Sequence, residues 1–224
     1  AIRIPCLEVT RMAAARIELK TLLLTLLGIT TVEFLSAGAM LLGASNPLVV
    51  TGVVRSLELL LMMAILVYSD RGLAAVGLSK STAARGLSKG LIWAAGFGCV
   101  AAGAGLVISL WGINPLQLMR IPLPSDPSET LQLFIVGGLV GPVTEELFFR
   151  GILYGYFRRW GIFTALFLST LFFVLLHPVK VLAVTQTVGG VLFAAAYEIE
   201  GNLLVPITIH VLGNLAIFSL AFLV

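Results

Sequence analysis

Residues 131–160 decide the fold, and they read LQLFIVGGLVGPVTEELFFRGILYGYFRRW. The run is apolar over more than the length that a helix needs to cross about 30 Å of hydrocarbon. A Gly-Pro pair at residues 141–142 interrupts it, and because proline has no backbone N–H the sequence predicts a kink or break there. The run also carries Glu145, Glu146 and Arg150. Charges inside a membrane span are costly and are therefore candidates for function.

The rest of the chain has the same apolar character. Hydrophobic residues make up 59% of the 224 residues, charged residues 11%, and the mean hydropathy is +1.08. A soluble domain carries about 25% charged residues, so this chain cannot cover a soluble surface. Continuous apolar runs containing Gly and Ala favour helices over the alternating pattern of a membrane barrel. Apolar blocks of spanning length cover residues 21–43, 48–69, 88–111, 130–150, 162–177, 181–197 and 203–223.

The fold class predicted from these blocks is all-α. We expect a polytopic transmembrane helical bundle with about seven membrane-spanning helices, within a range of about six to eight. No internal repeat or soluble appendage is visible, so residues 1–224 are expected to form a single integral membrane domain. Cys6 and Cys99 are too few for a disulfide framework.

The basic residues predict an orientation. They precede the first block, follow the second and follow the fourth, at Arg3, Arg11, Arg16, Lys20, Arg71, Lys80, Arg85, Lys89, Arg158 and Arg159. Seven crossings with a cytoplasmic N-terminus place all three groups inside. Residues 1–20 are expected to be a cytoplasmic or interfacial segment and not a signal peptide. The compact chain predicts a prokaryotic cell (inner) membrane, with the lipid bilayer as a partner and no nucleic acid.

Three ionisable residues lie in the apolar blocks of the first half. Arg55 and Glu58 are three residues apart and can pair on one helix face. We interpret them as a structural ion pair in preference to catalytic groups. Glu33 has no obvious partner in the sequence and is left without a role.

The second half contains both histidines of the chain. His177 follows Phe173 by four residues and His210 precedes Asn214 by four, so each pair shares a helix face. A lone histidine in a helix is more often structural, but two of them with a Glu pair and an Asn favour chemistry.

Helix geometry sorts the two glutamates. Successive residues point about 100° apart, so Glu145 and Glu146 are not expected to address one spot. Glu146 and Arg150 are spaced for an ion pair, with Glu on the preferred N-terminal side. This pairing leaves Glu145 as the working carboxylate. If the helices on either side of Gly161 form a hairpin, Glu145 and His177 both lie roughly 22–24 Å from the turn and are level.

His210 fits this estimate less well. It lies only about 10 Å along the last predicted helix, whose start near Pro206 is expected to be sunk into the protein.

The three motifs resemble those of the CAAX protease and bacteriocin-processing family, which includes the prenyl-protein endopeptidases of the Ras-converting type. The resemblance covers about 70 residues and places the catalytic helices within residues 130–224. It rests on Glu-Glu-x-x-x-Arg, Phe-x-x-x-His and His-x-x-x-Asn/Asp motifs in order, here Glu145-Glu146-Arg150, Phe173-His177 and His210-Asn214.

The resemblance implies an intramembrane glutamate-dependent endopeptidase acting on membrane-anchored protein or peptide substrates near their C-terminus. Glu145 with His177 would activate a water for attack on a peptide carbonyl. His210 and Asn214 would stabilise the oxyanion. Glu146 and Arg150 would orient Glu145, with Phe173 in support. The Gly-Pro pair at 141–142 and the glycines at 137–138 are expected to leave room for a water-filled cavity.

Other functions remain open at this point. No cofactor is expected, although two histidines and a glutamate could instead bind zinc, from three different helices. A serine protease is disfavoured because the spans lack Gly-x-Ser motifs. A transporter would show matching halves. A non-proteolytic bacteriocin-immunity or membrane binding protein is the main alternative. The substrate could be a prenylated C-terminus, a bacteriocin precursor or a protein with a C-terminal sorting helix.

Overall fold

The computed structural model describes residues 17–41, 43, 46–69, 71–118, 121–177 and 184–223. Residues 1–16, which include Cys6 and most of the predicted N-terminal segment, lie outside the described residues. Within the described part of the chain the secondary structure is helical, with no strand. The all-α fold class predicted from the apolar blocks is therefore confirmed.

The helices follow one another through short connections. The first half comprises α1 (Leu19–Leu41), α2 (Pro47–Val67), the 3₁₀-helix η1 (Gly72–Val76), α3 (Lys80–Leu110) and α4 (Pro115–Leu118). One long helical segment then contains α5 (Pro127–Ile135), the π-helix η2 (Val136–Val140), α6 (Gly141–Glu146), the π-helix η3 (Leu147–Tyr154), α7 (Gly155–Phe157) and the 3₁₀-helix η4 (Arg158–Trp160). The chain ends with α8 (Ile162–Leu175), α9 (Val184–Glu200), α10 (Leu204–Leu220) and η5 (Ala221–Leu223).

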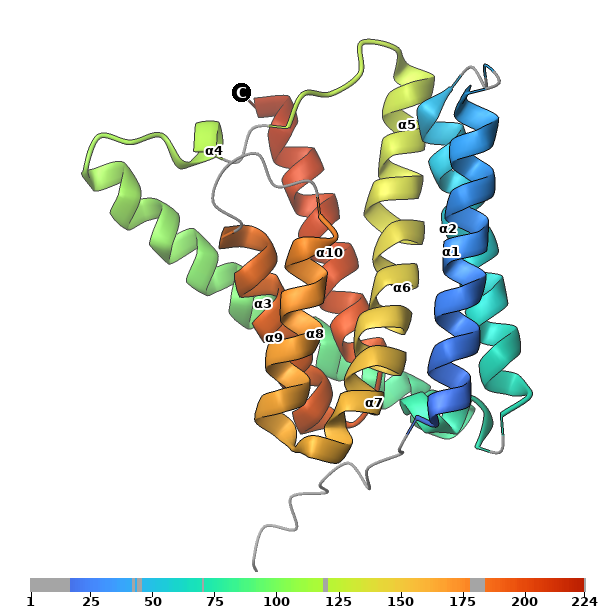
Figure 1. Cartoon of the computed structure of the whole chain (residues 1–224). Helices are drawn as coiled ribbons and strands as arrows, with labels where there is room; N and C mark the ends of the chain where they lie inside the picture. Colours follow the sequence, from blue (N-terminus) through green and yellow to red (C-terminus); the bar gives the residue numbers. More distant parts are fainter. Residues whose placement is uncertain are drawn as a thin grey trace, which may run out of the picture.

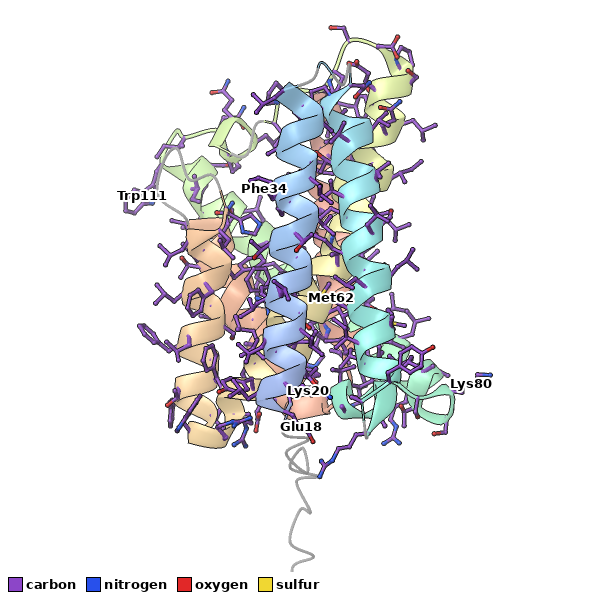
Figure 2. All side chains as sticks on the ribbon, turned by 45° about the vertical axis from the view of Figure 1, so that its right-hand side comes forward. Glu18, Lys20, Phe34, Met62, Lys80 and Trp111 are labelled. Atoms are coloured by element: carbon purple, nitrogen blue, oxygen red, sulfur yellow. The ribbon has the colours of Figure 1, made fainter. Side chains whose placement is uncertain are left out.

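Five of these segments are long and apolar enough to cross a membrane. They are residues 19–41, 47–67, 72–110, 127–160 and 204–223, and α8 is a shorter apolar helix. The side chains agree with a lipid-facing exterior, because Phe34 is exposed on the outer surface whereas Met62 is fully buried (Figure 2). The protein is thus an integral membrane helical bundle. The predicted number of about seven crossings stays a prediction, since α8 and α9 are short.

The bundle surrounds the long segment from α5 to η4. In Figure 1 the α1–α2 pair lies on one side of this segment, and α8, α9 and α10 lie on the other. Helix α3 crosses α10 with its first half and diverges from the bundle with its second half. The crossing is close because a Cβ atom at Gly90 would lie 2.6 Å from Cβ of Thr208. Gly90 therefore permits the close contact between α3 and α10 that fixes the position of α10.

Helix α5 begins at a typical capping sequence. Asp126 accepts hydrogen bonds from the backbone N–H groups of Ser128 and Glu129, and Pro127 occupies the first turn. The hydroxyl of Ser128 also donates to Asp126. These hydrogen bonds, led by that of the hydroxyl, hold the pKa of Asp126 below its ordinary value. The long segment therefore starts at a fixed residue, which sets the depth of Glu145 further along.

The long segment shows no break at the Gly-Pro pair. Instead, the π-helix η2 immediately precedes it, with the N–H of Gly141 donating to the carbonyl of Val136, five residues earlier. A π turn absorbs a register change without ending the helix. The expectation that the glycines at 137–138 leave a cavity is wrong. Cβ atoms there would lie 3.1 Å from the Phe218 ring and 2.6 Å from a Leu215 methyl, so α10 fills that space.

Candidate active site

Three motif side chains converge at the middle of the long segment. Glu145 comes from α6, His177 lies just after α8, and His210 lies on α10. Glu145 Oε2 is 3.6 Å from His177 Nε2 and 3.9 Å from His210 Nε2. The distances agree with the expectation that Glu145 and His177 are level, and His210, which fitted the depth estimate less well, reaches the same point.

The tautomer of His177 follows from its other nitrogen. Nδ1 lies 2.6 Å from the backbone carbonyl oxygen of Phe173, which can only accept a hydrogen bond. Nδ1 therefore carries the hydrogen. In the neutral ring the lone pair of Nε2 then faces the carboxylate of Glu145. Phe173 thus orients the imidazole of His177 in two ways. Its backbone carbonyl accepts a hydrogen bond from Nδ1, and its ring contacts the imidazole, with centroids 4.4 Å apart.

His210 is oriented by Glu146. Its Nδ1 lies 2.8 Å from Glu146 Oε1, so Nδ1 donates to that carboxylate and Nε2 points toward Glu145. The expectation that the two glutamates do not address one spot needs correction. They reach opposite edges of one imidazole, because that ring is wide enough to bridge side chains that leave the helix in different directions.

Arg150 completes the support of His210. It is fully buried, donates to Glu146 Oε1 at 2.8 Å and donates to the carbonyl of Gly190 at 3.2 Å. Its guanidinium carbon lies 4.5 Å from the ring centre of Phe173. The ion pair expected from the sequence is therefore present. Its contacts act on His210 through Glu146, and not on Glu145 directly.

Asn214 satisfies a carbonyl that the helix itself leaves free. In the π register the carbonyl of Gly137 points toward residue 142, and proline has no N–H to donate. The side-chain Nδ2 of Asn214 donates to this carbonyl at 2.8 Å. One N–H of the Asn214 amide is therefore committed to Gly137, and the second is available to a ligand.

Sequence reasoning missed one aromatic neighbour of the site. The ring of Phe193 on α9 stacks on His210, with centroids 4.7 Å apart and planes 22° apart. It also lies 5.1 Å from the guanidinium carbon of Arg150. A phenylalanine in an apolar helix carries no sequence signal of such a role.

The charged residues of the first half also reach the site. Arg55 pairs with Glu58, as expected, and its Nη2 lies 3.2 Å from Oε1 of Glu33, the glutamate that was left without a predicted partner. The backbone carbonyl of Arg55 accepts a hydrogen bond from the hydroxyl of Thr144, at 3.0 Å. Only the packing of α1 against α2, and of α2 against α6, reveals these links.

No group of three or more His, Cys, Asp or Glu side chains among the described residues is arranged to hold a metal ion. Zinc remains an alternative that a chelation experiment addresses.

The fold and the polar centre together define an integral membrane protein that holds carboxylate, imidazole and amide groups inside its helical bundle. Residues 127–216 match the family model described as Rce1-like, type II CAAX prenyl endopeptidase Rce1-like. This match supports the resemblance to the CAAX protease family that the motifs indicated, and all three motifs lie inside the matched residues. No curated protein and no solved structure matches the chain.

Proposed function

We propose that this protein is an intramembrane glutamate-dependent endopeptidase that cleaves membrane-associated protein or peptide substrates near their C-terminus. The observation that carries the proposal is the convergence of His177 Nε2 and His210 Nε2 on Oε2 of Glu145. In both histidines the Nδ1 atom is bound elsewhere, so the free ring nitrogens face the same carboxylate. The catalytic helices are those of residues 130–224.

The attacking water is held by two hydrogen-bond acceptors in this mechanism. The 3.6 Å between Glu145 Oε2 and His177 Nε2 is long for a direct hydrogen bond, and a water that donates one hydrogen to each atom can lie beside both. Its lone pairs are then free to attack the peptide carbonyl. As the new C–O bond forms, Glu145 takes a proton, and it returns this proton to the leaving amine when the C–N bond breaks.

The oxyanion of the tetrahedral intermediate needs donors on the other side of the carbonyl. The second N–H of the Asn214 amide is one. Nε2 of His210 is the other, and it donates only when the ring is an imidazolium because Nδ1–H already faces Glu146. The Glu146 carboxylate beside it stabilises that cation. Glu146, Arg150 and Phe173 are therefore positioning residues.

The substrate class follows from the family. The matching family model names CAAX prenyl endopeptidases, so an S-prenylated C-terminal peptide is the first substrate to test, alongside bacteriocin precursors and sorting-helix proteins. We further propose a prokaryotic cell membrane and a cytoplasmic N-terminus. The basic residues at one end of the bundle, among them Lys20 and Lys80, support this orientation (Figure 2).

The test is cleavage of this panel by the purified wild-type protein beside Glu145→Gln. The substitution keeps the shape and removes the base, so cleavage should fall by about 10²- to 10⁴-fold. Glu129→Gln, in the first turn of α5, is the matched control and should cleave as the wild type does. Cleavage that persists in Glu145→Gln would reject the mechanism. No cleavage of the whole panel by the wild type would favour the immunity or binding alternative.

Metal dependence is decided with the same substrates. Cleavage that survives thorough chelation would reject the zinc alternative, whereas loss restored by added Zn²⁺ would support it.

A further inference from the structure

A second group of charged side chains lies on α1 and α2, outside the three motifs. Arg55 Nη1 donates to Glu58 Oε2, and Arg55 Nη2 lies 3.2 Å from Glu33 Oε1. The exposed fractions of these side chains are 1% for Glu58, 33% for Arg55 and 46% for Glu33. Glu58 therefore binds the Arg55 guanidinium on its buried side, and Glu33 binds it on its solvent- or lipid-exposed side.

A hydrogen bond connects this group to the helix that carries Glu145. The hydroxyl of Thr144, the residue before Glu145, donates to the backbone carbonyl of Arg55. A partly exposed cation on α2 thus belongs to a residue whose backbone is bonded to the neighbour of Glu145.

The charges around Arg55 indicate which ligand it can take. The motif arginine, Arg150, is not available to a ligand, because it is fully buried and bound to Glu146 and Gly190. Arg55 is bound to Glu58 through one carboxylate oxygen, and Oε1 of Glu58 has no hydrogen-bond partner in the described structure. The guanidinium of Arg55 thus has N–H donors left for a second carboxylate. An anionic group at this depth is costly unless a cation meets it.

We propose that Arg55 binds the free C-terminal carboxylate of the substrate, which takes the place of Glu33. The inference rests on the proposed function, because an endopeptidase that cuts near the C-terminus has a carboxylate a few residues from the scissile bond, at about 3.3 Å per residue. Exchange of one carboxylate for another keeps the charge around Arg55 constant. The planar guanidinium suits a carboxylate in two-point contact.

Glu33 is the partner that exchanges, for two reasons. Its side chain is far more exposed than that of Glu58, and its contact with Arg55 is a single ion pair between two helices. In the absence of substrate Glu33 occupies the position of the terminal carboxylate. Removal of its charge should therefore strengthen the binding of a substrate that ends in a free carboxylate.

The test is a binding measurement on protein that carries Glu145→Gln and does not cleave. The probes are an S-farnesylated peptide ending in Cys-aliphatic-aliphatic-Ser and the same peptide with a C-terminal carboxamide. The carboxamide should bind about tenfold more weakly, since it lacks a charge-assisted hydrogen bond. Adding Glu33→Gln should tighten binding of the free acid and leave that of the amide unchanged.

The decisive variant adds Arg55→Gln and Glu58→Gln together. It removes both members of the pair, so no buried charge is left alone and folding is spared. The two peptides should then bind equally, whereas Glu58→Gln alone should keep the preference for the free acid. Equal binding before Arg55 is changed, a preference that survives its loss, or no binding of either peptide would overturn the inference.

The two proposals fail separately. Cleavage by the wild type without any preference for the free acid rejects the role of Arg55 and leaves the protease intact. A preference for the free acid that disappears with Arg55, in a protein that cleaves none of the panel, rejects the protease and keeps the carboxylate site.

Discussion

Arg150 lies entirely inside the protein, with Glu146, Gly190 and the Phe173 ring as its surroundings. Its removal leaves the Glu146 carboxylate buried without a cation. Breaking a buried ion pair in this way costs about 3–5 kcal/mol. We therefore expect Arg150→Ala to lower the unfolding temperature in detergent, the folding yield and the cleavage rate together.

Arg85→Ala is the control for that prediction. Arg85 is exposed on the first half of α3, and its loss should change the free energy of unfolding by less than about 0.5 kcal/mol. If Arg150→Ala unfolds as the wild type does and keeps its activity, the pair with Glu146 plays no part in holding His210.

Pro142 and Asn214 should be energetically coupled through the Gly137 carbonyl. Pro142 lacks the N–H that would donate to this carbonyl, and the Asn214 side chain donates to it instead. Asn214→Ala removes the donor of that carbonyl and should destabilise the protein by about 1–3 kcal/mol. Pro142→Ala supplies a backbone N–H in the same turn. In that background Asn214→Ala should cost at least about 0.5 kcal/mol less, measured as a double-mutant cycle on unfolding in detergent.

Pro127→Ala provides the matched control for this cycle. Pro127 also lacks an N–H, but it lies in the first turn of α5, where a backbone N–H would have no carbonyl acceptor within the helix. Its effect should add to that of Asn214→Ala. Additivity in both cycles would mean that Asn214 is not held by the carbonyl that Pro142 leaves free.

At the scale of elements, α3 supplies a matched pair of glycines. A Cβ atom at Gly90 would meet Thr208 of α10 at 2.6 Å, whereas one at Gly98 would meet nothing within 4 Å. Gly90→Ala should separate α3 from α10 and destabilise the bundle by about 1–3 kcal/mol. Gly98→Ala should be neutral or stabilising by up to about 1 kcal/mol, through helix propensity.

Thermal unfolding of the two variants in the same detergent measures the difference. Cleavage should fall with Gly90→Ala as well, since α10 carries His210 and Asn214. Equal stability of the two variants would show that α10 is not positioned by its crossing with α3.

At the scale of the whole molecule, the predicted orientation is open to direct test. Lys80 is the first residue of α3 and Ser125 precedes α5. These two helices begin at opposite ends of the bundle (Figure 1). With Cys6 and Cys99 replaced by Ser, an impermeant thiol reagent applied to intact cells should label Ser125→Cys and spare Lys80→Cys. The reverse pattern would place the basic end outside and contradict the cytoplasmic N-terminus.

The fold class could be predicted because hydrophobicity is a property of the residues themselves. Long apolar blocks in a chain with 11% charged residues leave few structures other than a membrane helical bundle. The pairs Glu146–Arg150 and Phe173–His177 were equally accessible, since spacing along one helix places their side chains on one face. The π-helix before Pro142 was not predicted, because a proline indicates strain without saying how the backbone absorbs it.

The sequence by itself therefore determined the membrane bundle, the three motifs and the pairing of Glu146 with Arg150. Only the tertiary structure decided that His210 bridges the two glutamates, that Asn214 caps Gly137, and that Glu33 meets Arg55 beside the site. The physical reason is the range of the interactions. Contacts within one helix follow from its 3.6-residue period, whereas contacts between helices depend on crossing positions that glycines and the π turn set.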